Sequence, residues 1–517
     1  MKTENHHKEL LNSSEVAIFS DENCHYSTIP PFHPGTMYPE YMFGDANTAI
    51  NQHKVDAYHA VREIFRLLEY DKKHYNTKTW NPLSEIIEPG QTVVIKPNFV
   101  LHLNYAGHDI FSSLTHPSII RAVADYCYIA LKGTGSVSIV ENPQMDCDFN
   151  EIERLMSLRS LTQFYKQTAG LDFKIYDTRR LQCKMALNKG YYPAESFIYN
   201  DKADPAGYVT IDLGMDSFLD RLSGIENLYG ADYDRKFTVE NHTNGVHKYC
   251  VSRSILKADT VICIPKMKTH KKVGVTLNIK LLVGINGDKN YLAHYRVGSP
   301  NNKGDEYPDQ LQNTTKARRK IYRWMYDHLL TKRRPFFDKL FLSIKFIETQ
   351  VINFLRLVTF RKKKAIAEKI GGGNWYGNDT AWRMSADLSK ILLYANSEGI
   401  MQEKPQRKVF SIIDGIVAGE GDGPMSPEPK HVGTLVAGKN ILAVDTAAVT
   451  FMGFDYKKIK MLALLWDNKK YPITRFPVSD TYIYSNDESL AGKRSDTCEK
   501  YQFKPHKNWV GHIEIRQ

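Results

Sequence analysis

The chain has 517 residues, of which 42% are hydrophobic and 25% are charged, and its formal net charge is +11. These proportions are those of a folded globular protein, and they argue against a mostly disordered, collagenous or coiled-coil chain. The seven cysteines have no repeated short spacing, so we expect neither a disulfide framework nor a cysteine-bound zinc ion or iron–sulphur cluster. Because neither a signal sequence nor a bilayer-spanning apolar run is evident, we predict a cytoplasmic protein.

The first half of the chain shows a strand–helix–strand pattern. Residues 1–50 are polar and rich in turn-forming residues, which predicts an irregular arm. Apolar residues at helical spacing over 55–68 indicate an amphipathic helix. Residues 92–95 form a short apolar run typical of a buried parallel strand, 117–131 predicts a helix, and 136–140 predicts the next strand. This spacing indicates a parallel sheet with a right-handed crossover.

The pattern returns later in the chain. Apolar runs at 258–264, 409–413 and 433–437 predict further strands, and 442–449 predicts a helix. Polar residues follow several of these strands, at the position where open α/β sheets bind their ligands. We therefore predict an α/β protein with an open, mostly parallel sheet and helices on both faces, plus a basic helical insertion.

The predicted organisation follows from shifts in periodicity and charge along the sequence. Its parts are an irregular arm (1–50), the first part of the α/β core (51–310) with a peripheral subdomain at about 150–250, a basic amphipathic helical insert (311–370), the second part of the core (371–480) and a C-terminal segment (481–517).

The positive charge is concentrated in the predicted insert. Residues 316–364 contain fifteen Lys and Arg against three acids, a net charge of +12, and the rest of the chain carries −1. Apolar residues recur there at three- and four-residue steps, which predicts one apolar stripe on a helix. Such a stripe with basic ends suits an anionic membrane surface, with candidate contacts Phe337, Phe341, Ile344, Arg333, Arg334, Lys362 and Lys363.

Two alternatives to membrane binding remain for the insert. It can be a helical hairpin packed on the body of the protein, with its charges simply solvated. It can also bind nucleic acid, but we favour this less because the aromatic residues lie on the apolar stripe.

A cluster of lysines is predicted where the strand at 258–264 ends. Lys266, Lys268 and His270 alternate along an extended segment, so their side chains are expected on one side. Lys96, at another strand end, and Lys280 are candidates to join them. Such a cluster suits a phosphate, pyrophosphate or carboxylate group. If water is excluded, one lysine becomes a candidate general base or Schiff-base nucleophile. The alternative is a solvated loop.

Neutral polar residues supply further candidate contacts to an oxygen-rich substrate. Asn98, His116, Thr276 and Asn278 are candidates near the strand ends, and the alternative for each is an ordinary turn or strand residue. The glycine-rich loop 370–380 can stack on a sugar ring and bind its hydroxyls, or can serve as a structural connection. Its candidate binding residues are Asn374, Trp375, Asn378 and Asp379.

Acidic residues form a second set at strand ends and loops. Glu141, Glu420 and Asp445 are candidates for proton transfer, together with Lys268 and His270 as catalytic residues. Asp414, Glu420 and Asp422 are weak candidates for binding Mg²⁺, although the two Asp-Gly pairs are equally consistent with turns. The glycines at 419–424 lack the residues of a phosphate-binding P-loop and the dinucleotide fingerprint, so we reject both nucleotide motifs.

Several of these segments together carry a family resemblance. VVIKPNFV at 93–100, THP at 115–117, the long run at 257–287 containing PKMKTH and GVTLNIK, and DGIVAGEGDGP at 414–424 resemble the domain-of-unknown-function family numbered 362. The resemblance covers most of 55–310 and 371–465. Many relatives carry ferredoxin-like cysteine runs, which are missing here, so the resemblance implies no iron–sulphur cluster for this chain.

The resemblance also suggests a substrate class. The long form with GGNWYGNDT resembles family members associated with bacterial surface-polysaccharide genes, which implies a phosphorylated or lipid-linked glycan substrate beside a membrane-binding insert. A fainter likeness to the N-terminal domain of lactate racemase implies a nickel-pincer nucleotide. His116 and His270, with Lys268 or Lys280, are then candidate counterparts, but the His-rich racemase motifs are not reproduced.

The leading hypothesis is therefore an enzyme in which Lys96, Lys266, Lys268 and His270 hold an anionic substrate. A carboxylate from Glu141, Glu420 or Asp445 would transfer a proton or hold a metal ion. The alternatives are a nickel-pincer racemase-like enzyme and a non-catalytic protein that binds polysaccharide precursors. The reaction type and the oligomeric state are left open.

Overall fold

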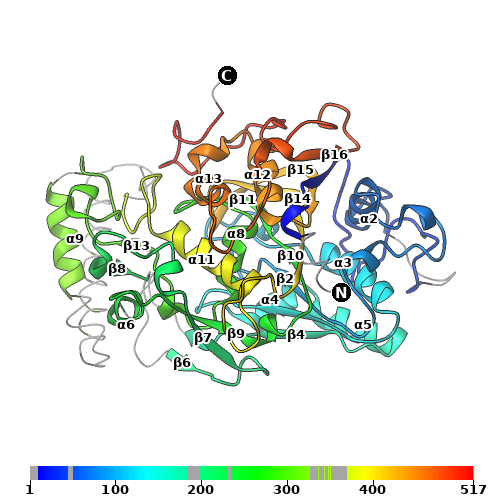
Figure 1. Cartoon of the computed structure of the whole chain (residues 1–517), viewed down its shortest axis with the longest axis horizontal. Coiled ribbons are helices and arrows are strands. Elements are labelled where there is room, and N and C mark those ends of the chain that lie inside the picture. Colours follow the sequence, from blue (N-terminus) through cyan, green and yellow to red (C-terminus); the bar gives the residue numbers. More distant parts are fainter. Residues whose placement is uncertain are drawn as a thin grey trace.

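The computed structural model describes residues 10–44, 51–183, 197–230, 235–311, 313–325 and 370–515, and the single positions 336, 340, 343, 347 and 350. Its core is a ten-stranded sheet with the strand order β16-β1-β15-β14-β10-β2-β3-β4, and β11 and β12 are attached beside β14 (Figure 1). Because most neighbouring strands are parallel and helices cover both faces, the predicted α/β class is confirmed.

The parallel part of the sheet is built from the predicted apolar runs. It comprises β14 (Lys408–Asp422), β10 (Thr260–Ile264), β2 (Thr92–Pro97), β3 (Ser136–Glu141) and β4 (Lys174–Asp177). Successive side chains of a strand face opposite sides, so Val93 and Ile95 enter one hydrophobic core and Val94 enters the other. β-Branched residues suit strands that are buried on both faces in this way.

The remaining strands of the sheet come from the two ends of the chain and from a long hairpin. β15 (Ser426–Gly438) pairs antiparallel with β14, β1 (Glu15–Ser20) pairs antiparallel with β15, and β16 (Tyr482–Ser485) pairs parallel with β1. The sequence predicted an irregular arm where β1 lies. A local pattern did not show this strand because its partner is distant in sequence, with Ala17 opposite Ala437.

Helices cover the two faces of the sheet. One face carries α2 (Ala57–Leu67), α3 (Pro117–Leu131), α4 (Phe149–Leu155) and α5 (Leu158–Ala169). The other carries α7 (Arg253–Leu256), α8 (Asn278–Leu281), α11 (Ala381–Tyr394), α12 (Ile441–Phe451) and α13 (Lys460–Trp466). Figure 1 shows α2, α3 and α5 on one side of the central strands and α8, α11 and α12 on the other.

Small elements lie at the periphery. They are the strand pairs β5 (Leu181–Cys183) with β6 (Phe197–Tyr199), β7 (Tyr208–Asp212) with β9 (Lys248–Ser252) and β8 (Leu228–Tyr229) with β13 (Tyr295–Arg296), and the helices α6 (Arg235–Glu240) and α9 (Asn313–Met325). Among the residues that the structure describes, no helix combines the length and the apolar character needed to cross a membrane.

A short hairpin extends the sheet at the point where β10 ends. β11 (Lys266–His270) pairs parallel with the long strand β14, and β12 (Gly274–Thr276) turns back antiparallel to β11. The pairing of β11 with β14 is irregular, because Lys266 lies opposite Asp414 whereas Lys268 lies opposite Gly419. This irregularity bears on which side chains of the hairpin reach the candidate site.

Candidate functional site

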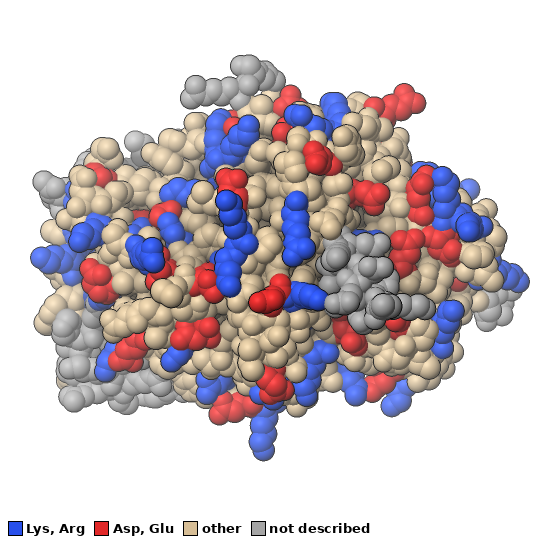
Figure 2. All heavy atoms as spheres, viewed as in Figure 1, with Lys and Arg blue, Asp and Glu red and all other residues tan. Residues whose placement is uncertain are grey.

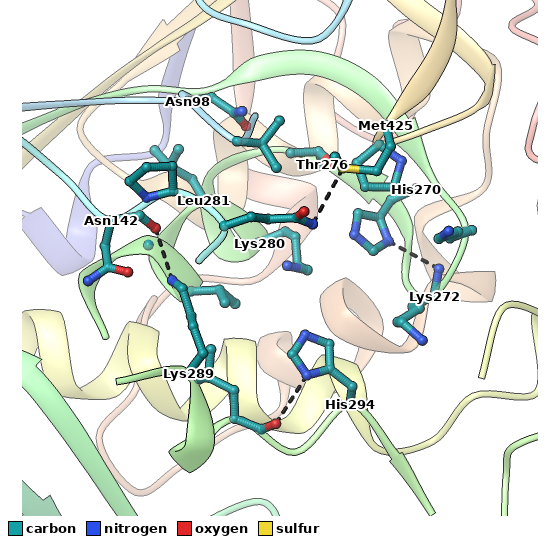
Figure 3. Close-up of a pocket in the computed structure, with 18 of the residues that line it drawn as sticks. Asn98, Asn142, His270, Lys272, Thr276, Lys280, Leu281, Lys289, His294 and Met425 are labelled. Carbon is teal, nitrogen blue, oxygen red and sulfur yellow. Dashed lines mark hydrogen bonds between the residues drawn. The ribbon is translucent and has the colours of Figure 1, made fainter. Parts of the chain in front are cut away.

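A cavity of about 360 Å³ lies at the carboxyl ends of β2 and β3, beside the β11–β12 hairpin and α8 (Figure 3). Its polar lining includes six lysines, two histidines and one carboxylate. These are Lys96, Lys268, Lys271, Lys272, Lys280, Lys289, His270, His294 and Glu141. The lining therefore carries many more cationic than anionic side chains. On the face drawn in Figure 2, by contrast, basic and acidic side chains are interspersed.

The carboxylate of the cavity is already paired. Glu141 Oε1 lies 2.6 Å from Lys96 Nζ, and both side chains are buried. Glu141 also accepts hydrogen bonds from the backbone N–H groups of Phe99, at 3.0 Å, and Asn142, at 2.8 Å. Gly284 packs against this pair, since a Cβ at that position would lie 2.8 Å from Lys96 Nζ. One negative charge is thus used by one lysine, and the remaining lysines have no carboxylate within the lining.

Three of these lysines, Lys268, Lys272 and Lys289, donate to neutral backbone carbonyls. Lys268 Nζ lies 2.6 Å from the Ser113 oxygen, and Lys289 Nζ lies 2.9 Å from the Asn142 oxygen. A carbonyl dipole compensates a buried ammonium group less than a carboxylate does. Burial lowers the pKa of Lys289 to about 7, assisted by Lys96 and Lys280 although Glu141 opposes the shift. Burial, with the charges of Lys266 and Lys280, also holds the pKa of Lys268 well below its ordinary value.

The two histidines of the cavity are neutral and have different tautomers. Burial and nearby lysines hold the pKa values of His270 and His294 well below the ordinary value. His270 Nδ1 accepts from the backbone N–H of Lys272 at 3.1 Å, which assigns the ring proton to Nε2. His294 Nδ1 lies 3.0 Å from the carbonyl of Leu292, which assigns the proton to Nδ1. One ring therefore offers a donor at Nε2, and the other offers an acceptor there.

Three polar atoms on lining residues have no hydrogen-bond partner within the part of the chain that the structure describes. They are Thr276 Oγ1, Asn142 Oδ1 and Asn374 Oδ1, and all are buried. Leaving a buried polar atom without a partner costs about 1–3 kcal/mol, so native proteins usually provide one. An oxygen-rich ligand in the cavity can provide it.

Lys266 is separated from the other residues of its motif. Its Nζ lies 2.9 Å from Asp414 Oδ2 and donates to the Tyr26 hydroxyl at 2.8 Å. Lys266 does not belong to the cavity lining. His116 joins this second buried cluster, because its backbone N–H donates to Asp414 and its ring stacks on Tyr26 at 3.9 Å. The expected grouping of Lys266, Lys268 and His270 on one side is therefore only partly met, where β11 and β14 change register.

Asp445 lies against the start of α8, the helix that begins at Asn278 and carries Lys280. Asp445 accepts from the Asn278 backbone N–H at 2.9 Å, the Asn278 amide at 2.7 Å and the Ile279 N–H at 2.9 Å. Ser411 in turn donates to the Asn278 side chain at 2.7 Å. Burial raises the pKa of Asp445 to about 7, against the effect of these N–H donors. These two candidate site residues hold the helix in place and do not line the cavity.

The other acidic candidates lie outside the lining as well. Glu420 accepts from Lys430 and from the Lys504 backbone N–H, each at 3.1 Å. Asp422 lies 3.4 Å from His506. Among the described residues, no group of three or more His, Cys, Asp or Glu side chains is arranged to hold a metal ion.

The loop 371–380 is held against neighbouring segments of the protein. Trp375 donates to the Asp305 carbonyl at 2.9 Å, Asn378 accepts from the N–H groups at the start of α11, and Asp379 pairs with Arg383 at 2.8 Å. Of the candidates in this loop, Asn374 lines the cavity, next to Gly372.

The cavity thus brings together part of the predicted set. Of the predicted site residues, it contains Lys96, Asn98, Glu141, Lys268, His270, Thr276, Lys280 and Asn374. Of the residues that the racemase likeness indicated, His270, Lys268 and Lys280 line the cavity. His116 instead lies in the second buried cluster, with Asp414 and Tyr26. The membrane candidates Phe337, Phe341, Ile344, Arg333, Arg334, Lys362 and Lys363 lie outside the described residues.

The comparisons with known proteins support one assignment. The family model described as "Domain of unknown function (DUF362)" matches residues 183–450. The chain belongs to this family. The matched stretch contains most of the cavity residues, including Lys268 and Lys280, whereas Lys96 and Glu141 precede it.

The chain was also compared with curated proteins and with solved structures. No curated protein matches the chain. A structural-genomics crystal structure of a protein from Thermotoga maritima is similar over 69% of this chain and 55% of that chain, with 10% sequence identity and a TM-score of 0.26. The match thus spans about half the length of the solved protein.

Sequence reasoning missed other residues of this DUF362 cavity, among them Asn142, Lys272, Lys289 and His294. Asn142 follows Glu141 at the end of β3, and Lys272 follows the KMKTH run, so their positions at strand ends were a usable signal. Lys289 and His294 lie in an irregular segment, where no periodicity indicates the direction of a side chain.

We expect the change Asp445→Asn to lower the free energy of unfolding by about 1–3 kcal/mol, because an amide group would face one of the buried N–H donors that the carboxylate now accepts from. Urea denaturation measures the change. Asp172→Asn, at an exposed carboxylate, is the matched control. Equal stability of the two variants would contradict the anchoring role of Asp445.

Proposed function

We propose that the cavity binds a small molecule with phosphate or carboxylate groups and that the protein is an enzyme acting on it. The observation that carries this proposal is the excess of lysine over carboxylate in the lining of the cavity. Oxyanions neutralise clustered ammonium groups and accept several hydrogen bonds at once. The unsatisfied atoms of Thr276, Asn142 and Asn374 support a ligand that also has hydroxyl or amide groups, such as a phosphorylated sugar or the charged end of a lipid-linked glycan.

The catalytic part of the proposal is supported by the protonation states. A neutral imidazole can accept a proton, and the Nε2–H of the neutral His270 can donate a hydrogen bond to a developing oxygen charge. Lysines with pKa values of about 7 and 8 supply both amine and ammonium forms near neutral pH. A protein that only binds a glycan precursor needs the positive charge but not these groups. Product formation from a panel of phosphorylated and carboxylated metabolites separates the two functions.

We expect Lys268→Met and Lys289→Met each to weaken pyrophosphate binding by about 10-fold or more, because a charge-assisted hydrogen bond contributes about 1.5–3 kcal/mol. Methionine fills similar volume and leaves no buried charge. Isothermal titration calorimetry measures the dissociation constants, with Lys166→Met, at an exposed position of α5, as the control. Unaltered affinity in both cavity variants would rule out this binding site.

Anion binding should also take up protons. An anion favours the charged form of a lysine, so it raises the pKa of Lys289 from about 7 and that of Lys280 from about 8. At pH 8 these lysines together lack roughly 1.4 protons, and binding should therefore take up about one proton or more. Titrations with sulfate in buffers of different ionisation enthalpy give this number.

Because sulfate binds the protonated lysines, raising the pH removes protons that binding must restore. The affinity for sulfate should therefore fall as the pH rises from 7 to 9 through the lowered pKa values of Lys289 and Lys280. Lys289→Met should reduce the proton uptake at pH 8, whereas Lys166→Met should not. Binding without proton uptake, or with proton release, would contradict the assignment of an anion to these lysines.

A second proposal concerns the surface near the basic insert. We propose that this region binds the surface of an anionic membrane. In its support, Ile321 and Trp324 on α9 are 62% and 56% exposed, and Phe336, Leu340 and Ile347 are exposed as well. Large apolar side chains next to lysines and arginines are the features of peripheral membrane binding.

We expect the double change Ile321→Ala and Trp324→Ala to reduce co-sedimentation with phosphatidylglycerol vesicles by about 10-fold or more, because each side chain loses about 1.5–3 kcal/mol of apolar burial. Ile400→Ala, at a residue that is 60% exposed elsewhere, is the control. If the double variant and the control sediment equally with vesicles, this surface does not contact lipid.

A further inference from the structure

Lys280 occupies a distinct position among the cavity lysines. It lies on α8, whose first residues, Asn278 and Ile279, are held by Asp445, and its side chain lines the cavity. Figure 3 shows it between Lys289 and His270. The buried network beneath the helix fixes the backbone from which this amine projects.

The Lys280 amine makes no hydrogen bond and no ion pair with any residue that the structure describes. Other cavity lysines do: Lys96 pairs with Glu141, Lys268 donates to Ser113, Lys272 to Gly372 and Lys289 to Asn142. A lysine that binds a permanent partner is occupied by it. Lys280 is available to a ligand.

The surroundings of Lys280 favour the neutral amine, which is the nucleophilic form. Burial lowers its pKa to about 8. At pH 7 about 10% of such a group is unprotonated, against about 0.03% of an ordinary lysine. Its fraction of free amine is therefore roughly 300 times that of a surface lysine.

Groups that can handle protons lie next to it. His270 lines the same cavity as Lys280, and Figure 3 shows both side chains facing it; the charge of Lys280 adds to the effect of burial in lowering the pKa of His270. The Nε2–H of His270 is a donor for a developing oxygen charge. Thr276, whose buried Oγ1 has no partner among the described residues, lines the same wall.

We propose that Lys280 forms a Schiff base with its substrate, and that the substrate class is an aldehyde or ketone carrying a phosphate or carboxylate group. This proposal rests on the proposed function, in which the other lysines bind the anionic group. The neutral Lys280 nitrogen attacks the carbonyl carbon, and one proton of this nitrogen passes to the carbonyl oxygen, which gives a carbinolamine. The hydroxyl group then leaves as water with the second proton of the nitrogen, and a C=N bond forms.

The test is reductive trapping with borohydride, which delivers hydride to the C=N carbon and leaves a stable secondary amine. The full-length protein is treated at pH 7 with glyoxylate, glycolaldehyde phosphate or acetone, reduced, and mapped by peptide mass spectrometry. We expect glyoxylate or glycolaldehyde phosphate to modify Lys280 at least 10-fold more than any surface lysine. Acetone, which has no anionic group, should label it weakly, and pyrophosphate should compete.

Substitutions at Lys280 and a parallel measurement of pyrophosphate binding distinguish failure of the Schiff-base proposal from failure of the anion site. Lys280→Met and Lys280→Arg should lose the modification while circular dichroism shows a retained fold, and Lys166→Met should keep it. If pyrophosphate binds but Lys280 is labelled no more than surface lysines, the Schiff-base proposal is wrong and the anion site stands. If pyrophosphate does not bind and no label appears, both proposals are wrong. Equal labelling by acetone and glyoxylate would overturn the anionic substrate class.

Discussion

Like charges held together away from water are costly, and the cavity of this protein is built around that cost. Its lysines come from the end of β2, from the β11–β12 hairpin, from α8 and from the segment that follows α8, and its one carboxylate is already bound to Lys96. The folded protein limits the repulsion in two ways. Backbone carbonyls compensate part of the charge, and lowered pKa values remove another part. Neither the carbonyls nor the lowered pKa values offset the repulsion between the lysines as well as a bound oxyanion would.

The fold separates binding from support. Lys266 and Asp414 neutralise each other next to Tyr26, and Asp445 holds α8 through backbone and side-chain N–H groups. These buried groups fix the hairpin and the helix, so the side chains that face the cavity are held in position by groups that take no part in binding. A site with its charges oriented in advance loses little free energy to reorganisation when an anion arrives.

The strand ends were predictable because buried parallel strands have continuous apolar runs, and polar residues directly after them must lie at one edge of the sheet. That reasoning located Lys96, Glu141 and Lys268. It assumed a regular strand for Lys266, and the change of register between β11 and β14 is a feature that no local pattern shows. The same limit applies to β1, whose partner is more than 400 residues away, and to Lys289 and His294 in an irregular segment. Carboxylates with polar neighbours looked like catalytic groups in the sequence, but Asp445 bonds to the helix that it supports.

A crystal structure of the protein soaked in tungstate tests most directly whether the lysine cavity holds an oxyanion. Tungsten scatters anomalously, so its position does not depend on the interpretation of weak density. We expect an anomalous peak inside the cavity, with tungstate oxygens within hydrogen-bond distance of Lys268 and Lys289. Peaks restricted to surface lysines, with the cavity empty at the same tungstate concentration, would contradict it.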